Sequence, residues 1–287
     1  VPSGLSKSIL FMENNSNYSA VHGFGISVKT KSNDVHGSII KCVKKNQPTT
    51  ENKTASERFL DVMGYFSDVH YSVQRFSDYK RVFENCNEDD HVFFGTLSSA
   101  IIPVLGKIKE IDVLYLIRHI QDKPYRGEEE KNPCHWLQRS QWLSNFLFFK
   151  SNIEKALIKV DGISEQNAKD VFERGFITYL SIWFAQGLID NTVEKKYLNQ
   201  FNGSQLFLHW PEINDDKMIK VIKVLYPRLR VVTEKIFNKI FRREVLENNI
   251  LNRYTSILLP SLLNKKSKYH KDFMPVYKSI TNPPEIF

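Results

Sequence analysis

Lysine and arginine recur at helical spacing in the last quarter of the chain. Lysines three residues apart share one face of a helix, and a later set at i, i+4, i+7 and i+8 does so again. Each cation beside a phosphate releases condensed counterions, so such an array can follow a nucleic-acid backbone. The predicted binding residues are Lys217, Lys220, Lys223, Arg228, Arg230, Lys235, Lys239, Arg242 and Arg243, continued by Lys265, Lys266 and Lys268.

Positive charge is concentrated in the same part of the chain. The 287 residues include 40 Lys or Arg and 32 Asp or Glu, for a formal net charge of +8. Residues 217–287 hold 15 basic and 5 acidic residues, a net of +10, which leaves −2 for residues 1–216. Any surface helix needs a solvated face, but few acids interrupt these stripes. A regional excess predicts an acidic partner, with nucleic acid ahead of a membrane surface.

A glycine pair near the N-terminus suggests a second kind of chemistry. Gly23 and Gly25 precede a predicted strand, Lys41 lies in a later strand, and Glu57 follows on a predicted helix. This order resembles the N-lobe of a protein kinase, where glycines admit phosphates and a Lys–Glu pair positions them. Downstream the pattern departs from the family, because Gly127 stands where the metal-binding asparagine belongs. We expect a structural hairpin here, with a nucleotide site of a phosphate-chemistry enzyme or pseudoenzyme as the alternative.

Other catalytic and metal-binding patterns are absent from the sequence. The eight histidines show no HxH, HExxH or HxxxH spacing, and the cysteines form no CxxC pair. We therefore predict no catalytic residue, no metal and no cofactor. The scattered, odd set of Cys42, Cys86 and Cys134 favours a reducing compartment, hence an intracellular, cytoplasmic or nuclear location. No segment reaches the roughly 18 apolar residues of a transmembrane helix, so none is expected.

The N-terminal part should supply a small sheet and helices that position these residues. Short apolar runs predict strands at 8–12, 25–31 and 37–44. Apolar residues spaced three or four apart from Phe59 to Phe83 predict one long helix, capped at Ser56. Residues 92–106 are ambiguous, and 111–120 fit a buried strand or a short helix. The polar segment 122–134 holds two prolines and a glutamate triplet, which indicates a loop at a subdomain boundary.

The C-terminal part should be helical. A helix is predicted at 135–159 and ends at Asp161-Gly162, and another starts at Ser164. The second helix carries an aromatic face that we assign to the core: Phe172, Phe176, Tyr179 and Trp183. Three more helical segments follow: one capped by Asp215, one from Pro227 to about Asn248, and one over 250–263 kinked at Pro260. The last residues are expected to be extended.

The predicted fold is α+β, with a small N-terminal β-sheet packed on a larger, predominantly α-helical body. Its expected parts are an α+β region (1–121), a helical region with basic C-terminal helices (135–264) and a basic extended tail (265–287). The leading function is a non-enzymatic binding or scaffolding protein whose basic C-terminal helices contact nucleic acid or an acidic protein surface. Besides the phosphate-chemistry alternative, a purely protein-binding module of a larger assembly remains, with the aromatic helices as its interface.

Overall fold

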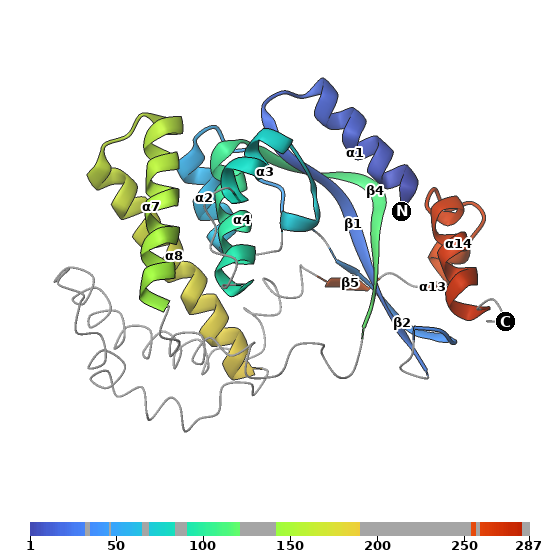
Figure 1. Cartoon of the computed structure of the whole chain (residues 1–287). Coiled ribbons are helices and arrows are strands. Elements are labelled where there is room, and N and C mark those ends of the chain that lie inside the picture. The colour runs from blue at the N-terminus through green and yellow to red at the C-terminus, as the bar shows by residue number, and fades with distance from the viewer. Residues whose placement is uncertain are drawn as a thin grey trace.

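A long strand, β1 (Tyr18–Thr30), forms the centre of a five-stranded mixed sheet. β4 (Lys107–His119) pairs with it in parallel, whereas β2 (Ile39–Lys45) and β3 (Val73–Gln74) pair with it antiparallel, and β5 (Tyr254–Ser256) adds to β2. Helices flank the β1–β4 pair on both sides, which confirms the α+β class (Figure 1). This computed structural model describes residues 1–31, 35–45, 47–64, 69–83, 91–120, 142–189, 254–256 and 259–282.

The first predicted strand is wrong, because residues 8–12 belong to helix α1 (Pro2–Asn14). Pro2 suits the first turn of a helix, where its missing N–H costs no hydrogen bond. The helix buries Gly4, Ser8 and Met12, spaced four apart, and contacts β1 and β4. A short apolar run cannot distinguish this helix from a strand. The next two predicted strands are confirmed as β1 and β2, although β1 begins earlier than expected.

The single long helix predicted from Phe59 to Phe83 is wrong in its second half. α2 (Ala55–Gly64) is followed by a 3-10 turn at Val69–Tyr71, by β3 and by α3 (Phe76–Phe83). Strand pairing between Val73 and Val21 takes over from helical propensity here. The apolar period in the sequence could not show that this edge of β1 needs a partner.

The two undecided segments fold as a helix and a strand. Residues 91–105 form α4 (His91–Leu105), which contains Pro103 in its last turn, and β4 follows immediately. α7 (Trp142–Asp161) and α8 (Glu165–Ile189) confirm the predicted helix pair, although residues 135–141 lie outside the described part. Gly162 has a φ of +67°, a left-handed conformation that suits the glycine predicted to end α7.

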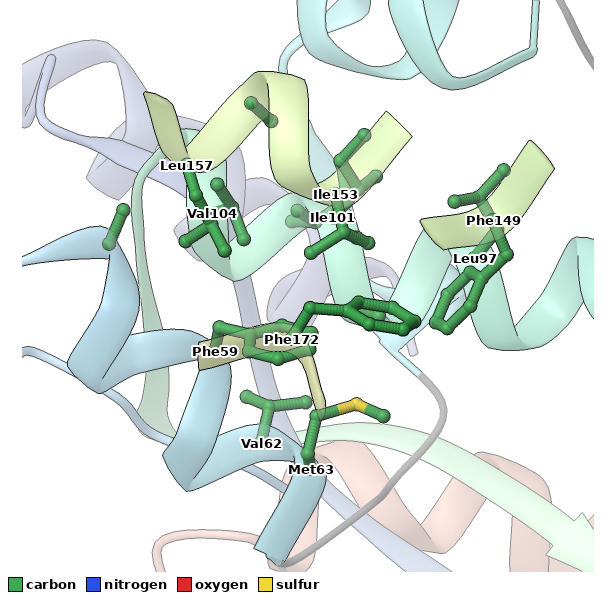
Figure 2. Close-up of a cluster of buried hydrophobic side chains, with 14 of the residues drawn as sticks. Phe59, Val62, Met63, Leu97, Ile101, Val104, Phe149, Ile153, Leu157 and Phe172 are labelled. Carbon is green, nitrogen blue, oxygen red and sulfur yellow. The ribbon is translucent and has the colours of Figure 1, made fainter. Parts of the chain in front are cut away.

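Four helices enclose the larger of two hydrophobic cores. Figure 2 shows side chains from α2, α4, α7 and α8 meeting around the ring of Phe172. Phe172 and Phe176 stack with their centroids 5.6 Å apart, and Tyr179 is buried beside them. The predicted core role of this aromatic face is confirmed for these three residues. Trp183 lies on α8, and its side chain falls outside the described residues.

The second core joins the sheet to the C-terminal segment. Phe24, Ile26 and Val28 of β1 pack with Phe273 and Ile280 of α14 (His270–Thr281), preceded by α13 (Leu259–Leu263). The expected extended tail is therefore wrong over α14, and the helix expected over 250–263 is wrong where β5 forms. Apolar residues recur at helical spacing in this segment, at Tyr269, Phe273, Tyr277 and Ile280, but its Lys and Pro content obscured that pattern.

The N-terminus of α2 is fixed by two acidic residues. Thr54, not the predicted Ser56, is the cap: its hydroxyl accepts the Glu57 N–H at 3.2 Å, and the Glu57 carboxylate accepts the Thr54 N–H at 3.1 Å. The Asp161 carboxylate, at the end of α7, accepts the N–H groups of Ala55 and Ser56 at 2.7 and 2.8 Å. A carboxylate here satisfies unpaired donors and opposes the helix dipole.

We expect Asp161→Ala to lower the free energy of unfolding by about 1–2 kcal/mol at neutral pH, since it removes this capping. Burial tends to raise the pKa of Asp161, but hydrogen bonds from Ser56 and Ala55 outweigh it and hold that pKa below its usual value. The contribution is therefore present above the unfolded pKa of about 4 and lost as pH falls through the lower folded pKa. Urea unfolding at pH 7 and near pH 2 measures both effects.

The exposed Asp170→Ala on α8 is the matched control and should change stability by less than about 0.5 kcal/mol. An Asp161→Ala protein as stable as the parent at pH 7 would contradict the capping role.

Candidate nucleic-acid interface

The structure places three of the twelve predicted binding residues. Lys265, Lys266 and Lys268 lie in the turn between α13 and α14. The remaining nine lie outside the described residues: Lys217, Lys220, Lys223, Arg228, Arg230, Lys235, Lys239, Arg242 and Arg243. The described part of the site is therefore the C-terminal segment 259–282 and the strands on which it docks.

Asp112 of β4 anchors the turn that carries these lysines. The ammonium group of Lys268 and the hydroxyl of Tyr269 both donate to the Asp112 carboxylate. The Tyr269 ring meets the ring of Phe24 edge-on, with the centroids 4.8 Å apart. Lys268, predicted to meet an external partner, thus has an internal one.

A bulge in β4 makes this anchor available. Gly23 of β1 lies opposite Ile111 and the next residue, Phe24, lies opposite Leu114, so Asp112 falls between two paired positions. Residues in a bulge leave the ladder, which re-aims their side chains. No sequence pattern signalled this bulge, and the anchoring carboxylate was missed for that reason.

The junction holds two carboxyl groups with opposite pKa shifts. Hydrogen bonds from Lys268 and Tyr269 lower the pKa of Asp112, while burial raises the pKa of Glu110, partly offset by the Gln47 N–H that Glu110 accepts. The ammonium of Lys44 on β2 lies over the ring of Phe24 on β1, 4.5 Å from its centroid. Both acids at this junction are thus engaged by groups of the protein itself.

The C-terminal segment is also attached at the β1–β2 turn. The Gly37 N–H donates to the Ile280 carbonyl at 2.8 Å, and Nδ1 of His36 lies 3.1 Å from the Ser279 carbonyl oxygen. Further along β2, Lys45 pairs with Tyr254 of β5. α14 and β5 therefore join the basic C-terminal region to the β1–β2 hairpin.

This docking brings together lysines from distant parts of the sequence. Besides Lys268, which binds Asp112, the segment 259–282 exposes Lys265, Lys266, Lys271 and Lys278, and it contains a single acid, Asp272. β2 contains no acid, and its Lys44 points to the side of the sheet on which α14 packs, whereas Lys41 and Lys45 point to the other side. Lys44 and Lys45 were not among the predicted binding residues, although lysines without acids along a predicted strand were a usable signal.

The glycines of the kinase-like pattern lie within β1 and not in a loop. A Cβ on Gly23 would come 2.2 Å from the Val113 carbonyl oxygen, so glycine is required where the bulged strand approaches. Lys41 lies opposite Lys29 in the sheet, and Glu57 is bound to Thr54. Gly23 therefore serves strand packing, and the phosphate-site alternative finds no glycine loop at Gly23 and Gly25, which both lie within β1.

The described ranges contain neither a metal-binding cluster nor a helix that could cross a membrane. Within those ranges, His, Cys, Asp and Glu side chains form no group of three that could hold a metal ion. Among the described helices, none is both long and apolar enough to cross a bilayer. Cys42 is buried, which raises its pKa to about 11, whereas Cys86 and Cys134 lie outside the described residues.

No family model, curated protein or solved structure matches this chain.

Proposed function

We propose that this protein is a non-enzymatic nucleic-acid-binding or scaffolding protein whose basic C-terminal region contacts the phosphate backbone. The observation that supports this is the docking of segment 259–282 against the β1–β2 hairpin (Figure 1). Through that docking, the exposed lysines of the turn and of α14 lie on the side of the sheet to which Lys44 of β2 points. Grouped cations raise the local concentration of a polyanion and speed its association.

The acidic groups near these lysines are few, and two of them accept hydrogen bonds from the protein itself. Asp112 is shared by Lys268 and Tyr269, and Glu110 is half-buried and accepts the Gln47 N–H. Asp272 is the one acid of segment 259–282. Four exposed lysines of this segment therefore outnumber its acidic groups. We place the protein inside the cell, in cytoplasm or nucleus, as part of this proposal.

Neutralising the exposed lysines of the C-terminal segment should weaken nucleic-acid binding. We expect the quadruple variant Lys265→Gln, Lys266→Gln, Lys271→Gln and Lys278→Gln to bind duplex DNA less tightly by up to about 3.6 powers of ten at about 0.1 M salt. The slope of log K against log salt should fall by up to about 3.6, because each lost phosphate contact removes about 0.9. Fluorescence anisotropy across a salt series measures both quantities.

A control variant loses the same charge from the segment before α2 and from α7 and α8: Lys53→Gln, Lys155→Gln, Lys159→Gln and Lys169→Gln, all exposed. Its slope should stay close to that of the parent. Equal losses in both variants would indicate a net-charge effect without a defined surface. A parent that binds neither DNA nor RNA at low salt would refute the proposal and leave an acidic protein surface as the partner.

A further inference from the structure

A second group of cations gathers on the sheet itself. Strand register places Lys29 of β1 opposite Lys41 of β2, and Ser27 of β1 opposite Val43 of β2 and Arg118 of β4. Lys45 lies opposite Gly25 of β1. Because alternate residues of a strand point to the same side, these cations share one face of three adjacent strands. We call Lys29, Lys41, Lys45 and Arg118 the cationic strand face.

This face points away from the core beneath the C-terminal helices. The intervening residues Ile26, Val28 and Cys42 belong to the core that packs on α14, so Ser27, Lys29 and Lys41 point to the other side. Lys41 and Arg118 are exposed, and Lys29 and Lys45 are partly exposed. The cationic strand face is therefore distinct from the lysines of α14.

The cations of this face are close together. Directly opposed side chains have Cβ atoms about 5 Å apart, so Lys29 and Lys41 repel each other. Lys41 and Lys45, four residues apart, are separated by about 13 Å, and Lys41 and Arg118 by two strand spacings of about 5 Å each. No acid occupies the strand positions among them: 25–29, 41–45 and 116–119. A chain of closely spaced negative charges, such as a phosphate backbone, is complementary to this arrangement of cations.

An aromatic ring stands beside the cations. The Arg118 guanidinium lies 5.5 Å from the centroid of the Tyr71 ring, which is 47% exposed. The Tyr115 hydroxyl donates to the Tyr71 carbonyl oxygen at 3.0 Å, which holds the residue over this part of the sheet. Cations that follow a phosphate backbone, combined with a ring on which a base can stack, suit a single strand better than a duplex.

We propose that the cationic strand face binds single-stranded nucleic acid, with phosphates along the four cations and a base stacked on Tyr71. This rests on the proposed function for the class of ligand, but it uses residues outside the C-terminal region. The occupant is set by charge complementarity and by the exposed ring. Duplex DNA lacks unstacked bases for Tyr71 and should gain less from this face.

The test compares two variants with the parent on a labelled single-stranded oligothymidine of about twenty nucleotides and on a duplex of equal length. Lys29→Gln, Lys41→Gln and Arg118→Gln together should lower the salt slope by about 2 and weaken single-strand binding roughly 100-fold at about 0.1 M salt. Tyr71→Leu should weaken single-strand binding about tenfold and leave duplex binding unchanged. Because Tyr115 binds the main chain of Tyr71, that substitution keeps the hydrogen bond.

A variant with Lys155→Gln, Lys159→Gln and Lys169→Gln on α7 and α8 is the charge-matched control and should bind as the parent does. Thermal melting checks each fold, and Arg118→Gln alone, at an exposed position, serves if the triple variant is unstable. Unchanged single-strand binding by the strand-face variants would overturn this inference, while losses in the C-terminal variant would still support the proposed function. If only the strand-face variants lose binding, the result would support this inference and contradict the proposed role of the C-terminal region. A parent that binds no nucleic acid would refute both proposals.

Discussion

Replacing Arg58 with Met should lower the free energy of unfolding by about 3–5 kcal/mol. Arg58 lies on α2 and is 5% exposed. Its guanidinium donates to the carbonyls of Pro103 and Val104 at the end of α4, at 2.7 and 3.1 Å. It also donates to the carbonyls of Asn52 and Lys53 at 3.0 and 2.9 Å. Met fills similar space but donates nothing, so buried carbonyls lose their partners, each at a cost of about 1–3 kcal/mol.

Urea unfolding followed by circular dichroism gives this free energy. Arg174→Met, at an exposed position of α8, is the control and should change stability by less than about 0.5 kcal/mol. The free energy of unfolding of Arg58→Lys should lie between those of the parent and of Arg58→Met, because an ammonium group lacks the planar fork that reaches several carbonyls at once. An Arg58→Met protein within about 0.5 kcal/mol of the parent would show that the carbonyls find other donors.

Arg58 illustrates what local sequence patterns cannot show. The apolar period placed Phe59, Val62 and Met63 in a helix, and the structure buries all three. The same period places Arg58 next to the apolar face of the helix, and an arginine at such a position is ordinarily expected to be exposed to solvent. Its role depends on the end of α4, more than forty residues away, which no local pattern reports.

The same distinction runs through the sheet. β1 and β2 were predicted because their apolar runs and the polar turn between them are local signals. β3 and β5 were missed because each is two or three residues long and exists through pairing with β1 or β2. Helix α14 was missed because its apolar residues become part of a core only when they pack against Phe24 and Ile26. In each case the deciding partner is distant in sequence.

The candidate interface was only partly predictable for a related reason. Lys265, Lys266 and Lys268 were selected by composition, and the structure exposes all three. Composition could not show that Lys268 would bind Asp112, since the bulge that presents this carboxylate arises from strand register. Composition also could not show that Lys29, Lys41 and Arg118 share one face of the sheet, because they come from three strands.

Reversing the charge of the second basic stripe should have the largest effect on binding. The variant Lys235→Glu, Lys239→Glu, Arg242→Glu and Arg243→Glu replaces four cations by four anions in the region that carries the net charge of +10. Loss of four phosphate contacts alone lowers affinity by about 3.6 powers of ten at about 0.1 M salt, and added repulsion lowers it further. We expect an affinity for duplex DNA more than about a thousandfold weaker, with a salt slope smaller by about 3.6.

Anisotropy titrations with duplex DNA at several salt concentrations test this, and circular dichroism confirms that the variant is folded. The control reverses three exposed cations of the helical body, with Lys155→Glu and Lys159→Glu on α7 and Lys169→Glu on α8, where no binding stripe was predicted. These positions are exposed, so their reversal should act only through long-range charge, which salt screens beyond about 10 Å at 0.1 M. If the stripe variant binds with the affinity and slope of the parent, the stripe is a solvated helix face, and the cations that remain must carry any binding.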